Sequence, residues 1–318
     1  MAIPAPDTVG VPSGAGAPAS GAPASGRAVV RDLLRRPGAA IAVGVLGLIG
    51  AMALAAPLLA GLTGWDQYSF DPSAIDSYSG GLPRGGWGGI SGDHWFGVEP
   101  GNGRDMFMRI AYGARVSLAI AISATVLTTT VGVVLGTLAG YFGGWVDTGL
   151  SRAMDFLMAF PALIFMIALL SALPGGNRPV LLVLVLSVFG WPYTARVVRG
   201  QALSLRNQEF VEAARASGAS RWAIVFREVL PNLRGTIVVL ATLAVPSYVA
   251  TEAGLSFLGV GVTPPTPSWG QMIASAATWY AVDPLFLVIP GAFLFATVVA
   301  FTVIGDHLKS ILDEGAVH

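Results

Sequence analysis

Long apolar stretches without aspartate, glutamate, lysine or arginine alternate with short charged segments along this chain. These stretches run from Arg36 to Asp66, Arg115 to Asp147, Asp155 to Arg178, Arg178 to Arg196, Arg234 to Glu252, Glu252 to Asp283, and Asp283 to Asp306. A helix needs about 20 apolar residues to cross the hydrocarbon core of a bilayer. We therefore predict an all-α polytopic membrane protein with six transmembrane helices, near residues 39–61, 114–138, 154–173, 180–197, 235–257 and 285–305.

Two segments between these spans are expected to lie outside the membrane core. Residues 259–282 are uncharged, but three prolines and several small polar residues predict a loop or a re-entrant segment. Residues 62–113 form a predicted extracytoplasmic loop, rich in glycine and aromatic residues and too short for a domain with its own core. We expect this loop to cap the outer mouth of the helix bundle and to contain a short helix at 104–112.

The first 36 residues precede the predicted spans. Alanine, proline, glycine and serine dominate residues 1–26, and such a composition cannot bury a core. The basic cluster at 27–36 lies directly before the first span, whereas a signal peptide begins with its basic residues. We therefore predict a disordered N-terminal tail at 1–36, a first span that is retained, and a transmembrane domain at 37–318.

The distribution of basic residues predicts the orientation, because cytoplasmic loops carry an excess of lysine and arginine. With the N-terminus inside, thirteen of the 18 basic residues lie on the cytoplasmic side and five lie outside. Both termini are therefore predicted to be cytoplasmic, and residues 198–234 form a cytoplasmic loop.

Composition excludes several classes of function. Hydrophobic residues make up 54% of the chain and charged residues 11%, and the mean hydropathy is +0.68, far from the balance of a soluble domain. The net charge of zero indicates no nucleic-acid partner. There is no cysteine, and the three histidines are too far apart in sequence to predict a metal site. A P-loop needs a Gly-Lys pair, but the only lysine, Lys309, follows a leucine, so this chain is not expected to hydrolyse ATP.

The cytoplasmic loop is unusually polar for this chain, with nine charged side chains between residues 199 and 234. Phe210, Ala213 and Ala214 fall at helical spacing on one face of a first predicted helix. Gly218 follows, and glycine readily takes the left-handed conformation that ends a helix.

A second predicted helix follows this glycine. Ser220 is placed to cap it, and Pro231 is expected to close it after Leu230, because proline disfavours helix at the preceding residue. Its apolar stripe consists of Trp222, Val225, Phe226 and Val229. Two short amphipathic helices that project from a membrane suit docking into a groove on a soluble partner.

Two other interpretations of the loop compete with docking. Its apolar faces could lie in the lipid interface, which would make the loop a structural connector. The spacing of Ala214 and Gly218 also resembles the turn of a helix-turn-helix DNA reader. Predicted spans lie directly before and after this loop, and the net charge of the chain is zero. Both observations argue against DNA binding.

The sequence Glu212-Ala213-Ala214-x3-Gly218, followed by Leu230-Pro231, resembles the cytoplasmic loop of bacterial ABC importer permeases. In that family this loop docks the ATP-binding subunits, so we call residues 198–234 the coupling loop. Further motifs over roughly residues 90–315 resemble the C-type permease subunit of dipeptide and oligopeptide importers. They include Gly103-Arg104-Asp105, Tyr112-Gly113-Ala114-Arg115, Gly140-Tyr141-Phe142-Gly143-Gly144, Leu255-Ser256-Phe257-Leu258-Gly259 and Pro264-Pro265-x-Pro267-x-Trp269-Gly270.

This resemblance implies the ABC importer permease fold and a non-catalytic subunit of the bacterial plasma (inner) membrane. Its partners would be the lipid bilayer, a second permease in a heterodimer, two ATP-binding subunits and an extracytoplasmic substrate-binding protein, with no nucleic acid. ATP and Mg would be bound by the partner subunits, and this chain would carry no cofactor and no metal. The implied solutes are di- and oligopeptides, with nickel chelates or glutathione as alternatives within the same architecture. A membrane receptor or scaffold, whose loop binds a different partner, is the alternative of another class.

The residues assigned to docking in the coupling loop are Glu212, Ala213, Ala214, Gly218, Trp222, Phe226, Leu230 and Pro231. Asp155 and Glu252 approach the membrane, where a buried charge is costly and is a candidate for a pathway or gating role. The structural alternative is that Asp155 pairs with Arg152 at the cytoplasmic mouth, and that Glu252 lies near the outer end. Glycines at 132, 136 and 140 recur at a spacing that favours close helix packing.

Overall fold

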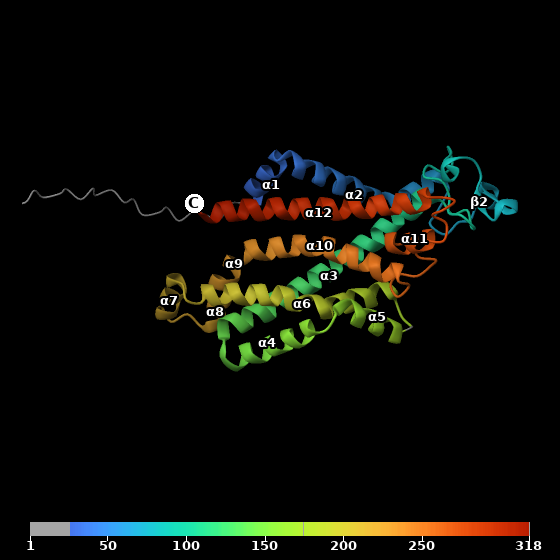
Figure 1. The fold of residues 1–318 in the computed structure, drawn as a ribbon. Coiled ribbons are helices and arrows are strands. Elements are labelled where there is room, and N and C mark those ends of the chain that lie inside the picture. Colours follow the sequence, from blue (N-terminus) through green and yellow to red (C-terminus); the bar gives the residue numbers. More distant parts are fainter. Residues whose placement is uncertain (1–25, 174, 318) are drawn as a thin grey trace, which may run out of the picture.

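Long helices lie side by side along one axis of the molecule (Figure 1). A computed structural model describes residues 26–173 and 175–317. The long helices are α2 (Pro37–Thr63), α3 (Met106–Phe142), α6 (Arg178–Leu205), α10 (Arg234–Phe257) and α12 (Leu285–Val317). The shorter helices are α1 (Gly26–Arg35), α4 (Gly144–Ala159), α5 (Ala162–Ala172), α7 (Glu209–Ala216), α8 (Arg221–Ile224), α9 (Leu230–Asn232) and α11 (Trp269–Ala276). A short antiparallel pair, β1 (Ile75–Asp76) and β2 (Leu82–Pro83), lies in the segment at 62–113, which we call the outer loop after the side predicted for it.

The longest helix that can cross a bilayer is α3, with 37 residues. At 1.5 Å per residue it is about 55 Å long, so it extends well beyond a hydrocarbon core of about 30 Å. Its glycines at 132, 136 and 140 lie against α6 with no room for side chains. A Cβ at Gly132 would lie 2.6 Å from the Thr194 Cβ, and a Cβ at Gly136 would lie 2.5 Å from the Ala195 carbonyl oxygen. Together with Gly140, these contacts confirm the close packing predicted from the glycine spacing.

The span predicted at 154–173 is not one continuous helix. It is divided between α4 and α5, which are bent by 83° relative to each other. Phe160 and Pro161 at the break have extended backbones. At Phe160 this conformation is expected, because the proline ring disfavours the helical conformation at the residue before it. Five described helices are long and apolar enough to span a membrane, and the bent pair makes six if it counts as one span.

Other predicted boundaries also shift. Residues 26–35 form helix α1, so the predicted disordered tail at 1–36 is wrong there, and residues 1–25 lie outside the described residues. The short helix expected at 104–112 is instead the first part of α3. The uncharged segment at 259–282 contains α11, whose first four residues are buried. The predicted loop therefore contributes a buried helix to the outer half of the molecule.

Candidate functional site

The coupling loop lies at one end of the molecule, far from the outer loop with its β-strands (Figure 1). It begins in the last two turns of α6, forms α7, turns, and continues through α8, a π-helix at Val225–Val229 and α9 into α10. Glu209 and Glu212 occupy the first turn of α7, where negative charge complements the positive end of the helix dipole.

The turn after α7 depends on a glycine, as the sequence predicted. Gly218 has a φ of +80°, and its N–H donates a hydrogen bond to the Arg215 carbonyl at 3.0 Å. The Ala219 N–H donates to the Ala214 carbonyl at 3.1 Å. These two bonds form a Schellman motif, which satisfies carbonyls that would otherwise lack partners at the end of the helix.

The second helix begins as predicted but does not end as predicted. The Ser220 hydroxyl accepts a hydrogen bond from the Ala223 N–H at 3.2 Å, which is the expected N-cap. Leu230 and Pro231 do not close the helix, because the backbone continues through the π-helix into α9 and α10. Pro231 stands in the first turn of α9, where its missing N–H costs least.

Buried side chains hold the coupling loop against α3 and α6. They come from each part of the loop and join one apolar cluster with residues of both long helices. The loop contributes Val211, Ile224, Val225, Val229 and Leu233, and the long helices contribute Val133, Tyr141, Val198 and Ala202. The loop is therefore a packed element rather than a free connector.

The apolar stripe predicted for the second helix is partly buried and partly exposed to solvent. Val225 and Val229 are buried in the cluster, but Trp222 is 55% exposed and Phe226 is 61% exposed. Their rings stack with centroids 6.2 Å apart. On α7 the buried residue is Val211, Phe210 is exposed, and Ala214 is half-buried against the same cluster, so the face predicted from Phe210, Ala213 and Ala214 is only partly covered. Glu212 and Ala213 are exposed, and the loop presents both a carboxylate and an aromatic pair to solvent.

Asp155 lies on α4, more than half exposed, and pairs mainly with α6. Its carboxylate accepts a hydrogen bond from Arg196 at 2.6 Å, whereas Arg152 is 3.9 Å away. The structural pairing expected with Arg152 is thus the weaker of two contacts. A second ion pair, between Asp147 and Arg199, also links α4 to α6. A gating role for Asp155 stays a prediction.

Glu252 is fully buried near the outer end of α10. One carboxylate oxygen accepts a hydrogen bond from the Ser117 hydroxyl of α3 at 2.9 Å, and the other accepts one from the Ser256 hydroxyl at 2.7 Å. The Ser117 oxygen also accepts the Trp269 N–H at the start of α11. These contacts tie three elements together, and a pathway role for Glu252 stays a prediction.

A buried ionic centre in the outer half is not among the site residues predicted from the sequence. Arg109, which is 1% exposed, pairs with the Glu99 carboxylate of the outer loop. Its guanidinium also donates to the Gln67 carbonyl at 3.1 Å, the Pro265 carbonyl at 3.2 Å and the Gln271 side chain at 3.0 Å. In the sequence, Arg109 is a charged side chain five residues before the span predicted at 114–138, a position that predicts a residue outside the membrane core.

His94 forms a second polar centre beside it. Its Nδ1 lies 2.9 Å from the Asp105 carboxylate, and its Nε2 lies 3.2 Å from the Asp71 carboxylate. A hydrogen bond from the Ser73 hydroxyl, with a smaller contribution from His94, holds the pKa of Asp71 below its usual range. Within the described residues, no group of three or more His, Cys, Asp or Glu side chains is arranged to hold a metal ion.

Comparison with known proteins identifies the family. A family model described as "Binding-protein-dependent transport system inner membrane component" matches residues 132–316. The glutathione transport system permease protein GsiD of Pectobacterium atrosepticum is 40% identical over 225 residues, which cover 71% of this chain and 74% of that protein. The oligopeptide transport system permease protein OppC of Bacillus subtilis is 40% identical over 223 residues, which cover 70% and 72%. An inward-facing structure of the MetNI methionine ABC transporter matches with a TM-score of 0.49 and 20% identity, over 63% of this chain and 94% of that one. This chain belongs to the family of binding-protein-dependent transport system inner membrane components, and it is a non-catalytic, membrane-spanning permease subunit of an ABC importer.

Proposed function

We propose that this chain forms, with a second permease, the translocation pathway for short peptides, and that its coupling loop docks an ATP-binding subunit. The observation that carries the proposal is the contrast between the two sides of the loop. One side is buried against α3 and α6, while Glu212, Trp222 and Phe226 are exposed. A force applied to the exposed side would therefore act on two long helices.

The proposed complex contains two ATP-binding subunits on the cytoplasmic side and a substrate-binding protein on the outer side. The ATP-binding subunits bind ATP and Mg, since this chain has no P-loop. The excess of basic residues in the loops at the coupling-loop end supports cytoplasmic N- and C-termini. Figure 1 is consistent with this arrangement, because α1, α7 and the C-terminal end of α12 lie at the same end of the molecule.

Peptides are the solute class that we favour. The spans are dominated by small and aliphatic residues, which would tolerate varied side chains along a pathway. The names of the relatives also support glutathione, itself a short peptide, as a second candidate. Uptake of labelled di- to pentapeptides, glutathione and nickel in a deletion strain distinguishes these solutes. Loss of nickel uptake with normal peptide uptake would contradict the peptide assignment.

Charge reversal at Glu212 tests the docking role. Glu212→Lys is expected to reduce co-purification of the ATP-binding subunit by about tenfold or more, because it places a positive charge on the docking surface. Glu209→Lys is the matched control, since it makes the same charge change in the same exposed first turn of α7 outside the assigned docking residues. Equal effects of both changes would point to helix-dipole or net-charge effects instead of a docking contact. Co-purification of another protein in place of an ATPase would favour the scaffold alternative.

A further inference from the structure

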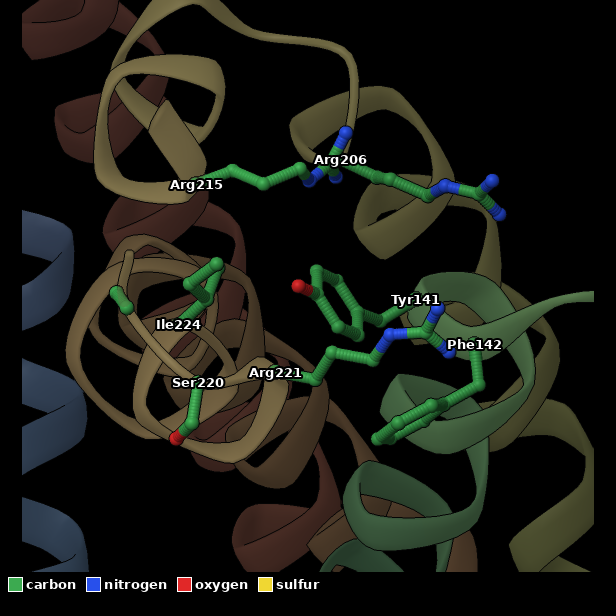
Figure 2. Close-up of a pocket in the computed structure, with 8 residues that line it drawn as sticks. Tyr141, Phe142, Arg206, Arg215, Ser220, Arg221 and Ile224 are labelled. Atoms are coloured by element: carbon green, nitrogen blue, oxygen red, sulfur yellow. The ribbon is translucent and has the colours of Figure 1, made fainter. Parts of the chain in front are cut away.

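A cavity of about 540 Å³ lies between the inner end of α3 and the coupling loop (Figure 2). Three arginines line it: Arg206 follows α6, Arg215 is near the end of α7, and Arg221 begins α8. Tyr141 of α3 lies among these side chains in Figure 2. None of the described residues that line the cavity is acidic.

In the described part of the chain, the three arginines lack the carboxylate partners that two neighbouring arginines of α6 have. On α6, Arg196 pairs with Asp155, and Arg199 pairs with Asp147. Within residues 26–173 and 175–317, no carboxylate lies within 4 Å of the guanidinium groups of Arg206, Arg215 or Arg221. Three uncompensated positive charges around one concave surface produce a potential that favours an anion carrying more than one oxygen.

Aromatic residues place this cavity near the level of the membrane surface. Tyr141 and Phe142 end the long uncharged stretch of α3, and Trp145 follows with 86% of its surface exposed. The Trp222 ring contacts Phe142, with centroids 5.1 Å apart. Tyrosine and tryptophan concentrate at membrane–water interfaces, and the inner leaflet carries anionic lipids that attract basic side chains.

We propose that Arg206, Arg215 and Arg221 bind a phosphate group, supplied by the headgroup of an anionic phospholipid or by soluble phosphate. The guanidinium group matches phosphate because its donors can bond two oxygens at once. The Tyr141 hydroxyl provides a further donor or acceptor in the cavity. The bound group would join the end of α6 to α7 and α8. No residue assigned to ATPase docking lines this cavity, so the proposal does not depend on the docking role.

Native mass spectrometry of the full-length chain in a neutral detergent tests this proposal. The probes are phosphatidylglycerol and phosphatidylcholine, each added to wild type and to Arg206→Gln, Arg215→Gln, Arg221→Gln and the triple variant. Each arginine is expected to contribute about fivefold to phosphatidylglycerol affinity, and the triple variant should bind on the order of a hundredfold more weakly. Arg227→Gln is the matched control, because Arg227 is an exposed arginine of the same loop that does not line the cavity.

The outcomes separate the sources of the phosphate group and the competing explanations. Retention of phosphatidylglycerol in excess inorganic phosphate would indicate a lipid headgroup, and its displacement would indicate that free phosphate occupies the site. An equal loss in Arg227→Gln, or no loss in the triple variant, would overturn the proposal. It would also be wrong if the triple variant bound phosphatidylglycerol normally but lost the ATP-binding subunit, because the arginines would then contact a protein partner.

Discussion

Valine at position 218 would have to adopt the left-handed backbone conformation that Gly218 holds, with a φ of +80°. Both hydrogen bonds of the Schellman motif depend on that conformation. A Cβ added at this position would have no heavy atom within 4 Å, so the added Cβ itself meets no steric clash. The cost of Gly218→Val is therefore confined to the backbone of the turn between α7 and α8.

The magnitude follows from this geometry. A non-glycine residue in the left-handed region costs on the order of 1–3 kcal/mol, and β-branched residues are especially unfavourable there. The long helices are not affected, so the protein should still insert into the membrane. A docking equilibrium that depends on the native turn would weaken by about 5- to 150-fold. Transport driven by ATP is expected to fall accordingly, at unchanged levels of protein in the membrane.

The measurement is ATP-dependent peptide uptake, with the amount of permease in the membrane determined by immunoblot. Gly218→Asn is the matched control, because asparagine tolerates the left-handed conformation better than other non-glycine residues. The expected order of activity is glycine, then asparagine, then valine. Wild-type transport by Gly218→Val would refute the reasoning. Equal loss in both variants would show that the backbone conformation is not the limiting feature.

Three further predictions concern packing, topology and pH. Gly136→Ala should lower the free energy of unfolding in detergent by about 1–3 kcal/mol, because its Cβ would lie 2.5 Å from a carbonyl oxygen of α6. Gly200→Ala is the control, because a Cβ at Gly200 would lie in open space. In this cysteine-free chain, Gly92→Cys should react with an impermeant thiol reagent from outside and Ala219→Cys should not; reversed labelling would contradict the topology. Burial raises the pKa of Asp283 above its ordinary value of 3.8, so stability should decrease as pH rises through that raised pKa. The temperature of thermal unfolding, measured as a function of pH, should show this decrease in wild type but not in Asp283→Asn. Equal pH profiles of the two proteins would contradict a role of Asp283.

The positions of the spans could be predicted because uncharged runs of sufficient length are rare outside membrane helices. The ends of the spans are predicted less accurately, because the prediction assumes that a charged residue marks the end of a span. Arg109 breaks that assumption, since it lies inside α3 and is paired with Glu99 and three further oxygen acceptors. A buried charge whose partners lie elsewhere in the chain has no signature in a single sequence.

In the coupling loop, local backbone features could be predicted from the sequence, but the burial of side chains could not. Gly218 and Ser220 were assigned correctly because their roles depend on local backbone geometry. Which apolar residues of the second helix are buried could not be predicted. Trp222 and Val225 fit the same helical spacing, but Trp222 is exposed and Val225 is buried. Only the packing of α3 and α6 decides which of them is buried. Pro231 was expected to end a helix, and a preceding π-helix instead allows the chain to continue.

Contacts at both ends of α10 connect the coupling loop to the outer half of the molecule. At the inner end, Leu233 is buried in the apolar cluster that holds the loop. At the outer end, Glu252 accepts hydrogen bonds from Ser117 of α3 and from Ser256, whose oxygen in turn accepts the Val262 N–H of the loop that leads to α11. Buried polar groups are costly to leave unpaired, so these outer contacts resist local separation. A displacement of the coupling loop would therefore tilt α10 together with α3, instead of moving the inner end of α10 alone.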